Sequence, residues 1–138
     1  DVDPVLGSTE SLRRALANLV TNALQSSGGG GGVRIVARNS RRYPYMVAIG
    51  VQDRAGGVPE QAVSKIFEPF FSTRPTGAGL GLSIARGITE AHDGTLLLEN
   101  HPEQGATFWT RLPSSRSPFA LRVRSDPPPA APSSQEEQ

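Results

Sequence analysis

The sequence lacks several residues and segments on which common protein functions depend. It contains no cysteine, which excludes disulfides, thiolate chemistry and cysteine-based zinc sites. Its two histidines, His92 and His101, stand apart from each other, which disfavours a histidine-based metal site. No apolar run approaches the roughly 20 residues of a membrane-spanning helix, and no signal peptide is visible. We therefore expect a cytoplasmic setting.

The net charge is also small, because fourteen basic and thirteen acidic residues leave a formal charge of +1. This balance argues against a general nucleic-acid surface or a polybasic membrane surface, so we expect neither as a partner of this domain. A length of 138 residues corresponds to one domain with a substantial core. Since the chain opens on Asp1 rather than Met, we expect a longer parent protein, which the sequence leaves either free or membrane-anchored.

The composition changes near residue 113. Six prolines fall among the last 26 residues, which end in a polar run from Ser133 to Gln138. Such a composition buries too little apolar surface to fold by itself. The sequence therefore predicts a folded domain over residues 1–112 and a disordered tail or linker over residues 113–138.

A long amphipathic helix is predicted near the N-terminus. Ser8 and Glu10 provide a cap and an acidic first turn. Apolar residues then recur at helical spacing, at Leu12, Ala15, Leu16, Leu19, Val20, Ala23 and Leu24. Asn18 and Asn22 lie four residues apart on this helix, although asparagine disfavours helix interiors. Because side chains at this spacing point the same way, we interpret them as a functional pair; the alternative is a solvated face.

Alternating patterns predict four strands, at residues 33–38, 46–51, 95–99 and 106–112. The first two are expected to form a hairpin, preceded by a flexible connector of five glycines at residues 28–32. Asp53 follows the second strand and leads into the glycine turn of residues 54–59. A carboxylate at this place is typical of a binding site, although an aspartate also caps its own turn. A short helix is then predicted from Pro59 through Ile66.

A glycine-rich stretch, Gly77 to Leu82, leads into a predicted helix over residues 80–92. The N-terminus of a helix favours phosphate, although glycine turns also occur where no ligand binds. No lysine follows Gly81, which excludes a P-loop, and no strand precedes Gly77, which excludes a dinucleotide fingerprint. The three aromatic residues of Phe67 to Phe71 precede this stretch and are predicted to belong to the core.

These motifs occur in one order: Asn18–Ala23, Asp53–Pro59, Phe67–Phe71 and Gly77–Leu82. They resemble the N box, first glycine box, F box and second glycine box of the ATP-binding catalytic domain of bacterial sensor histidine kinases. The short stretch between the last two boxes resembles the nitrogen-regulation type of these kinases. The resemblance covers residues 1–112, with the opening strands of the family's domain expected to be truncated.

The resemblance implies a two-layer α/β sandwich of the Bergerat ATP-binding type, with a mixed β-sheet carrying helices on one face. It also implies ATP and Mg²⁺ as cofactors. The residues that it assigns to nucleotide binding are Asn18, Asn22, Asp53, Gly57, Ile66, Arg74, Gly77, Gly79, Leu80, Gly81 and Leu82.

The implied roles follow the chemistry of each side chain. Asp53 accepts a hydrogen bond from the adenine amino group, where guanine would present a carbonyl oxygen. Asn22 is an oxygen ligand for Mg²⁺. Asn18 stands where hydrolysing relatives have a glutamate that activates water, and an amide cannot take that proton. Arg74 is the expected phosphate clamp in a mobile lid over residues 73–79.

Several positions depart from the family's pattern, among them Ala55 and Ala106 on the adenine side, and no phosphoacceptor histidine box is present. The resemblance therefore implies the catalytic domain of a two-component histidine kinase. It would transfer the γ-phosphoryl group of ATP to a histidine in a dimerisation domain absent from this chain, and so act on a response regulator indirectly. Two alternatives stay open: a nucleotide-binding regulatory module without catalysis, and an ATPase of the same superfamily.

Overall fold

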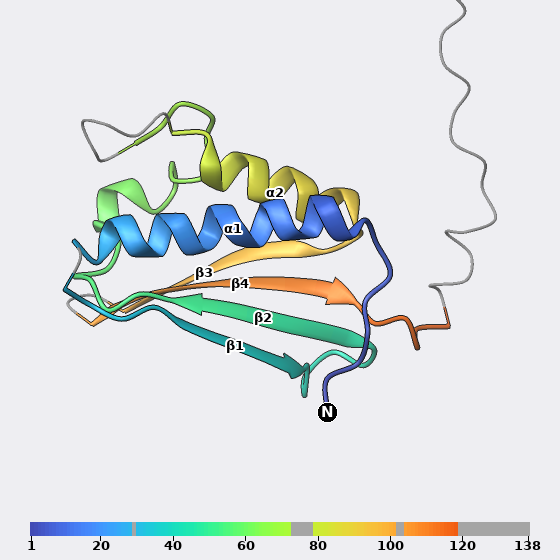
Figure 1. Cartoon of the computed structure of the whole chain (residues 1–138). Helices are drawn as coiled ribbons and strands as arrows, with labels where there is room; N and C mark the ends of the chain where they lie inside the picture. Colours follow the sequence, from blue (N-terminus) through green and yellow to red (C-terminus); the bar gives the residue numbers. More distant parts are fainter. Residues whose placement is uncertain (29, 73–78, 102–103, 119–138) are drawn as a thin grey trace, which may run out of the picture.

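In the part of the chain that a computed structural model describes, four antiparallel strands form one sheet with two α-helices on one face (Figure 1). The structure describes residues 1–28, 30–72, 79–101 and 104–118. Strands β1 (Arg34–Asn39), β2 (Met46–Gln52), β3 (Thr95–His101) and β4 (Gly105–Pro113) lie in the order β1-β2-β4-β3. The predicted α/β sandwich with helices on one face is confirmed. The three pairings described are all antiparallel, whereas a mixed sheet was expected.

The two helices are α1 (Thr9–Ser26) and α2 (Gly81–Ala91). Ser8 caps α1 as predicted, since its side chain accepts a hydrogen bond from the N–H of Ser11 at 3.2 Å. At the same end of the layer, His92 follows α2 and its Nε2 accepts a hydrogen bond from the N–H of Ser8 at 3.1 Å. The end of α2 therefore holds the start of α1.

The core lies between the helices and the sheet. Small side chains, Ala15 and Ala23 of α1 and Ala85 of α2, are almost completely buried and let the helices pack closely. Phe108 of β4 and Leu19 of α1 are the largest apolar side chains of the described core that are fully buried. The apolar periodicity of α1 thus identifies its buried face at Ala15, Leu19 and Ala23, although Leu24 of the same stripe is 55% exposed.

Two local predictions were wrong. The segment after Pro59 forms a single 3₁₀ turn, η1 (Glu60–Ala62), and continues in three-residue turns instead of a helix through Ile66. The β-branched Val63 and Ile66, with Pro69 soon after, favour this tighter path. Strand β1, predicted to be half-buried, is mostly exposed, because it is the edge strand and α1 contacts β2 instead.

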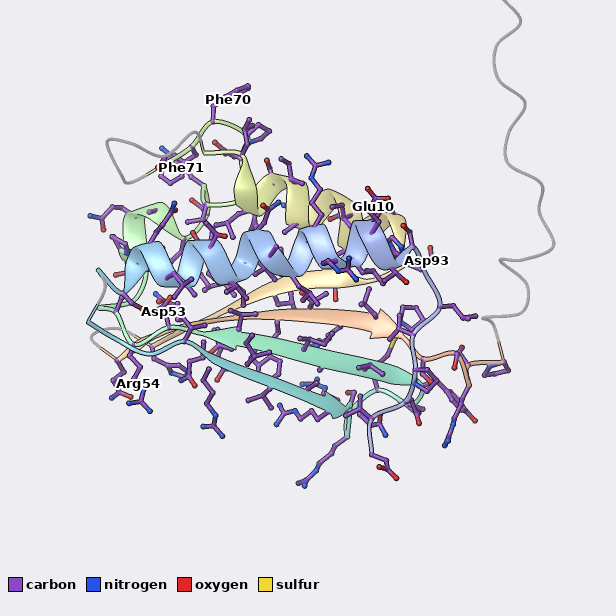
Figure 2. All side chains as sticks on the ribbon, in the orientation of Figure 1. Glu10, Asp53, Arg54, Phe70, Phe71 and Asp93 are labelled. Atoms are coloured by element: carbon purple, nitrogen blue, oxygen red, sulfur yellow. The ribbon has the colours of Figure 1, made fainter. Side chains whose placement is uncertain are left out.

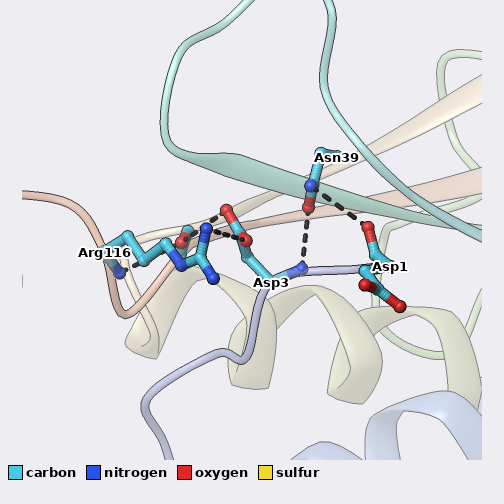
Figure 3. A network of polar contacts seen from close by, with 5 residues as sticks. Asp1, Asp3, Asn39 and Arg116 are labelled. Atoms are coloured by element: carbon cyan, nitrogen blue, oxygen red, sulfur yellow. Dashed lines mark hydrogen bonds and ion pairs between the residues drawn. The ribbon is translucent and has the colours of Figure 1, made fainter.

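The N-terminal segment is hydrogen-bonded to the end of the sheet at which β1 and β4 finish (Figure 3). The N–H of Asp3 donates to Asn39 of β1 at 2.8 Å, and the carboxylate of Asp3 pairs with Arg116 at 3.3 Å. Ser114, fully buried, donates to the same carboxylate at 3.2 Å. Hydrogen-bonded structure thus continues past residue 112, while residues 119–138 of the predicted tail lie outside the described part. Within that part, neither helix has the length and apolarity to cross a membrane.

Candidate functional site

A cavity of about 640 Å³ opens between α1, the loop after β2, the turns that follow η1 and the start of α2. Its volume falls in the range of small-molecule sites. Nine of the eleven predicted binding residues line it: Asn18, Asn22, Asp53, Gly57, Ile66, Gly79, Leu80, Gly81 and Leu82. The other two, Arg74 and Gly77, lie outside the described residues, as does the predicted lid except Gly79. The fold therefore brings four separate sequence motifs to one cavity.

Asn18 and Asn22 line the cavity from one face of α1, as their spacing predicted. The amide nitrogen of Asn18 is buried and finds no hydrogen-bond acceptor among the described residues. A buried donor without a partner is costly, about 1–3 kcal/mol, so native proteins rarely keep one without a reason. A ligand with acceptor atoms in this cavity would satisfy it.

Asp53 lies below the C-terminal end of α1 and is only 3% exposed (Figure 2). Its Oδ1 accepts hydrogen bonds from the N–H of Ala55 at 3.0 Å and of Ala106 at 3.2 Å. The N–H of Asp53 in turn donates to the carbonyl of Ala106 at 3.0 Å. Asp53 thus caps its own turn and also lines the cavity, so both interpretations of this residue apply. The two backbone donors fix the carboxylate in place.

Asn100 of β3 holds the glycine loop, and the sequence analysis did not single it out. Its side chain accepts from the N–H of Val58 and donates to the carbonyl of Val58, both at 2.8 Å. Gly57 beside it has φ +80°, and an added Cβ would lie 2.8 Å from the Asn100 oxygen. Asn100 lies inside β3 but just beyond the strand predicted over residues 95–99, so the rarity of asparagine in strands was not available as a signal.

The start of α2 closes the other end of the cavity. Gly79 has φ +72°, and its carbonyl accepts from the N–H of Phe70 at 2.9 Å. An added Cβ at Gly79 would lie 2.5 Å from the carbonyl carbon of Phe70, so this position requires glycine. Leu80 and Gly81 then present the N-terminus of α2 to the cavity. Backbone N–H groups and the helix dipole make this end a favourable place for phosphate.

The aromatic cluster is only partly in the core. Phe67 packs edge-on against Phe108, with ring centroids 6.1 Å apart, and Phe71 lines the cavity. Phe70 instead is 78% exposed and points away from the molecule (Figure 2). Its backbone has φ +66°, which places the side chain outward while its N–H reaches Gly79.

The residues around the cavity fit Mg-ATP without a dedicated metal cluster. The described residues contain no group of three or more acidic or histidine side chains that could hold a metal. Mg²⁺ commonly takes one or two protein oxygens and completes its shell with phosphate and water, and the amides of Asn18 and Asn22 offer such oxygens. Ala55 and Ala106, which depart from the pattern of the family, both line the cavity.

Comparisons with known proteins agree with this geometry. Residues 7–116 match the family described as histidine kinase-, DNA gyrase B- and HSP90-like ATPase. Sporulation kinase A of Bacillus subtilis is 35% identical over 107 residues, and sensor protein FixL of Bradyrhizobium diazoefficiens is 34% identical over 113. These alignments cover 78% and 82% of this chain but 17% and 22% of those relatives.

Solved structures show the same likeness. The catalytic domain of the histidine kinase ThkA, in a nucleotide-free form, superposes with a TM-score of 0.70 at 35% identity. This match covers 80% of this chain and 70% of that one. Full-length ShkA in complex with AMPPNP superposes with a TM-score of 0.72 at 33% identity, over 82% of this chain and 23% of that one.

Proposed function

The chain belongs to the family of histidine kinase-, DNA gyrase B- and HSP90-like ATPases, as a catalytic domain of the sensor histidine kinase type, and on this premise we propose that it binds Mg-ATP and donates the γ-phosphoryl group to a histidine on another domain. The dimerisation domain that carries the histidine, in the same protein or another, and a response regulator beyond it are proposed partners. We also propose a cytoplasmic location, where ATP is available.

One observation carries the proposal. The buried carboxylate of Asp53 and the N-terminus of α2 lie at different parts of one cavity of about 640 Å³. A carboxylate accepts hydrogen bonds from an amino group, and a helix N-terminus attracts phosphate. A ligand with an amino-bearing ring and a phosphate chain, as in ATP, fits both ends.

Each residue at the cavity would contribute to nucleotide binding through the chemistry of its own side chain or backbone. Asp53 would select adenine, because guanine presents a carbonyl oxygen that the carboxylate repels. Asn22 and Asn18 would hold Mg²⁺, which neutralises charge on the phosphates when bound. The amides of Gly79 to Leu82 would orient the phosphate chain. Phosphoryl transfer depends mainly on such positioning, and an asparagine at Asn18 provides no base for water attack.

Within the family, the nitrogen-regulation type is proposed as the subtype. The sequence Asn22-Ala-Leu-Gln25 and the short stretch between Phe71 and Gly77 support it. In the resemblance to sensor histidine kinases, Gln25 stands where many members carry a phosphate-binding lysine, and it lines the cavity as Asn22 does.

The experiment is phosphotransfer from γ-labelled ATP to histidine-bearing dimerisation domains supplied separately, including those of the relatives named above. Label on the histidine supports the proposal. Tight binding of Mg-ATP without label on any acceptor would favour a regulatory module, and phosphate release without an acceptor would favour an ATPase.

Asn22→Ala provides the matched test of the metal role. We expect it to abolish Mg²⁺-dependent transfer while circular dichroism shows an unchanged fold, because the side chain lies at the cavity and not in the core. Asn39→Ala, at the far end of β1, is the control and should transfer normally. An Asn22→Ala variant that unfolds would show that the residue is structural.

A further inference from the structure

The face of the sheet opposite the helices has its own chemistry. Both helices lie on one face of the sheet (Figure 1), and we define the outer sheet face as the opposite face, formed by the strand residues in register with Trp109 and Thr107. A shallow depression of about 240 Å³ lies on it, lined by Arg34, Val36, Arg38, Gly50, Gln52, Glu99, His101, Thr107 and Trp109. Among the described residues, nothing covers this face, and none of its side chains enters the nucleotide cavity.

Trp109 of β4 is fixed at the centre of the face. Its register partner on β2 is Gly50, where an added Cβ would lie 2.7 Å from the ring. The indole N–H donates to Glu99 of β3 at 2.6 Å, and the guanidinium of Arg38 lies 4.7 Å from the ring centre. Contacts from three neighbouring strands therefore hold one aromatic ring flat against the sheet.

The charged side chains on this face that form no ion pair are positive. Arg34, Arg38 and Arg111 lie on it, and in the described part of the chain none of them forms an ion pair. The one carboxylate among the described residues of this depression, Glu99, is already engaged by Trp109 and by His101 at 2.9 Å. The hydrogen bond from Trp109, followed by that from His101, lowers the pKa of Glu99, so this carboxylate stays ionised but paired.

The positive face continues onto the β1–β2 hairpin. The guanidinium of Arg111 lies 5.1 Å from the ring centre of Tyr43, and that of Arg42 lies 5.5 Å from it. Tyr43 is 41% exposed and Leu97 of β3 is 39% exposed. Aromatic and aliphatic surface at the centre with arginines around it is the composition of an interface hot spot.

We propose that the outer sheet face is a docking surface for an acidic protein segment, in which Asp or Glu side chains surround apolar ones. The stacked guanidinium groups of Arg38 and Arg111 are held by aromatic rings and can each bind a carboxylate through two N–H groups. The apolar side chains of the partner would contact Trp109 and Leu97. Because the nucleotide cavity lies on the other side of the sheet, such a partner binds without displacing ATP.

Two other anionic occupants fit less well. Single-stranded nucleic acid needs an aromatic face on which bases stack, and the ring of Trp109 is half-buried and already contacts Arg38. An anionic membrane surface is bound best by apolar side chains that insert among the lipids, whereas Trp109 is half-buried between neighbouring strands. Carboxylates on a folded or helical protein segment meet neither obstacle.

The test uses the fluorescence of Trp109, which is the one tryptophan of the chain. The probe is an amphipathic peptide of Glu and Leu, and its Gln-for-Glu analogue is the matched control. We expect the acidic peptide to change the Trp109 emission and to bind more weakly as salt rises. Arg34→Glu combined with Arg38→Glu should weaken binding by about tenfold or more, whereas Arg13→Glu with Arg14→Glu on α1 should leave it unchanged.

The milder pair Arg34→Gln and Arg38→Gln, with Mg-ATP binding as a check of the fold, separates lost docking from lost structure. The proposal is overturned if the acidic peptide does not bind, if the Gln analogue binds equally well, or if the charge-reversed chain binds as tightly. Salt-dependent binding of a single-stranded oligonucleotide or of phosphatidylglycerol vesicles in place of the peptide would identify the other class of occupant and equally refute it.

Discussion

At the scale of single residues, Asp53 restricts the identity of the ligand most specifically. Asp53→Asn keeps an oxygen for the N–H groups of Ala55 and Ala106 but turns an N–H₂ group toward the base. We expect ATP affinity to fall by about 1–3 kcal/mol, the usual value for a lost hydrogen bond to a charged group. GTP affinity should fall less or rise, because the new amide matches a carbonyl oxygen. Calorimetry with both nucleotides measures this, and equal losses for ATP and GTP would remove Asp53 from base selection.

Asn100 is expected to act through the loop that it holds. Asn100→Ala removes both hydrogen bonds to Val58 and should weaken Mg-ATP binding severalfold. Asn100→Asp keeps the acceptor for the N–H of Val58 but loses the donor to its carbonyl. Its affinity for Mg-ATP should therefore lie between those of Asn100→Ala and the wild type. Calorimetry on the three proteins gives the order of affinities. If the affinity only falls in step with the melting temperature, and Asn100→Asp does not lie between Asn100→Ala and the wild type, then Asn100 has a general structural role.

The sequence singled out residues whose chemistry is unusual for their position, and the structure places those that it describes at one cavity. Asn18 and Asn22 stood out because helices rarely keep two asparagines four residues apart, and Asp53 because it leaves a buried strand. Asn100 was missed because its partner, Val58, is 42 residues away, and only the fold brings the two together. The exposure of Phe70 was missed for a similar reason, since its positive φ depends on the contact with Gly79.

At the scale of elements, the join between the aromatic cluster and α2 depends on Gly79. Gly79→Ala places a Cβ against the backbone of Phe70 at a positive φ, which costs about 1–2 kcal/mol from the backbone conformation alone. We expect a lower free energy of unfolding and weaker nucleotide binding. Gly87→Ala is the matched control: this site inside α2 has open space around it, so alanine should stabilise the helix by up to about 1 kcal/mol. A Gly79→Ala variant as stable as wild type would contradict the described contact.

Periodicity predicted α1, α2 and the four strands to within one or two residues at most ends. It failed after Pro59, where β-branched residues and the nearby Pro69 favour short-range turns over a regular helix. It also could not show that β1 would be an exposed edge strand, because the order of strands in a sheet is a property of the whole fold.

At the scale of the whole molecule, the sheet separates two surfaces with different chemistry. The helical side carries the cavity with Asp53 and the start of α2, and the outer sheet face carries Trp109 among arginines. A nucleotide on one side and a protein partner on the other would suit a domain that works as part of a larger kinase. The relatives agree with such a setting, since this chain spans about a fifth of the length of the two curated proteins compared.

The central claim is that the cavity between α1 and α2 binds Mg-ATP, with the base at Asp53 and the phosphates at the start of α2. A titration of the ¹⁵N-labelled chain with a magnesium complex of a non-hydrolysable ATP analogue tests it most directly. We expect the amides of residues 53–58 and 79–82 and the side-chain amides of Asn18 and Asn22 to shift, while the indole N–H of Trp109 stays unchanged. Saturation without shifts at Asp53 and Gly81, or with the largest shifts on the outer sheet face, would contradict the account.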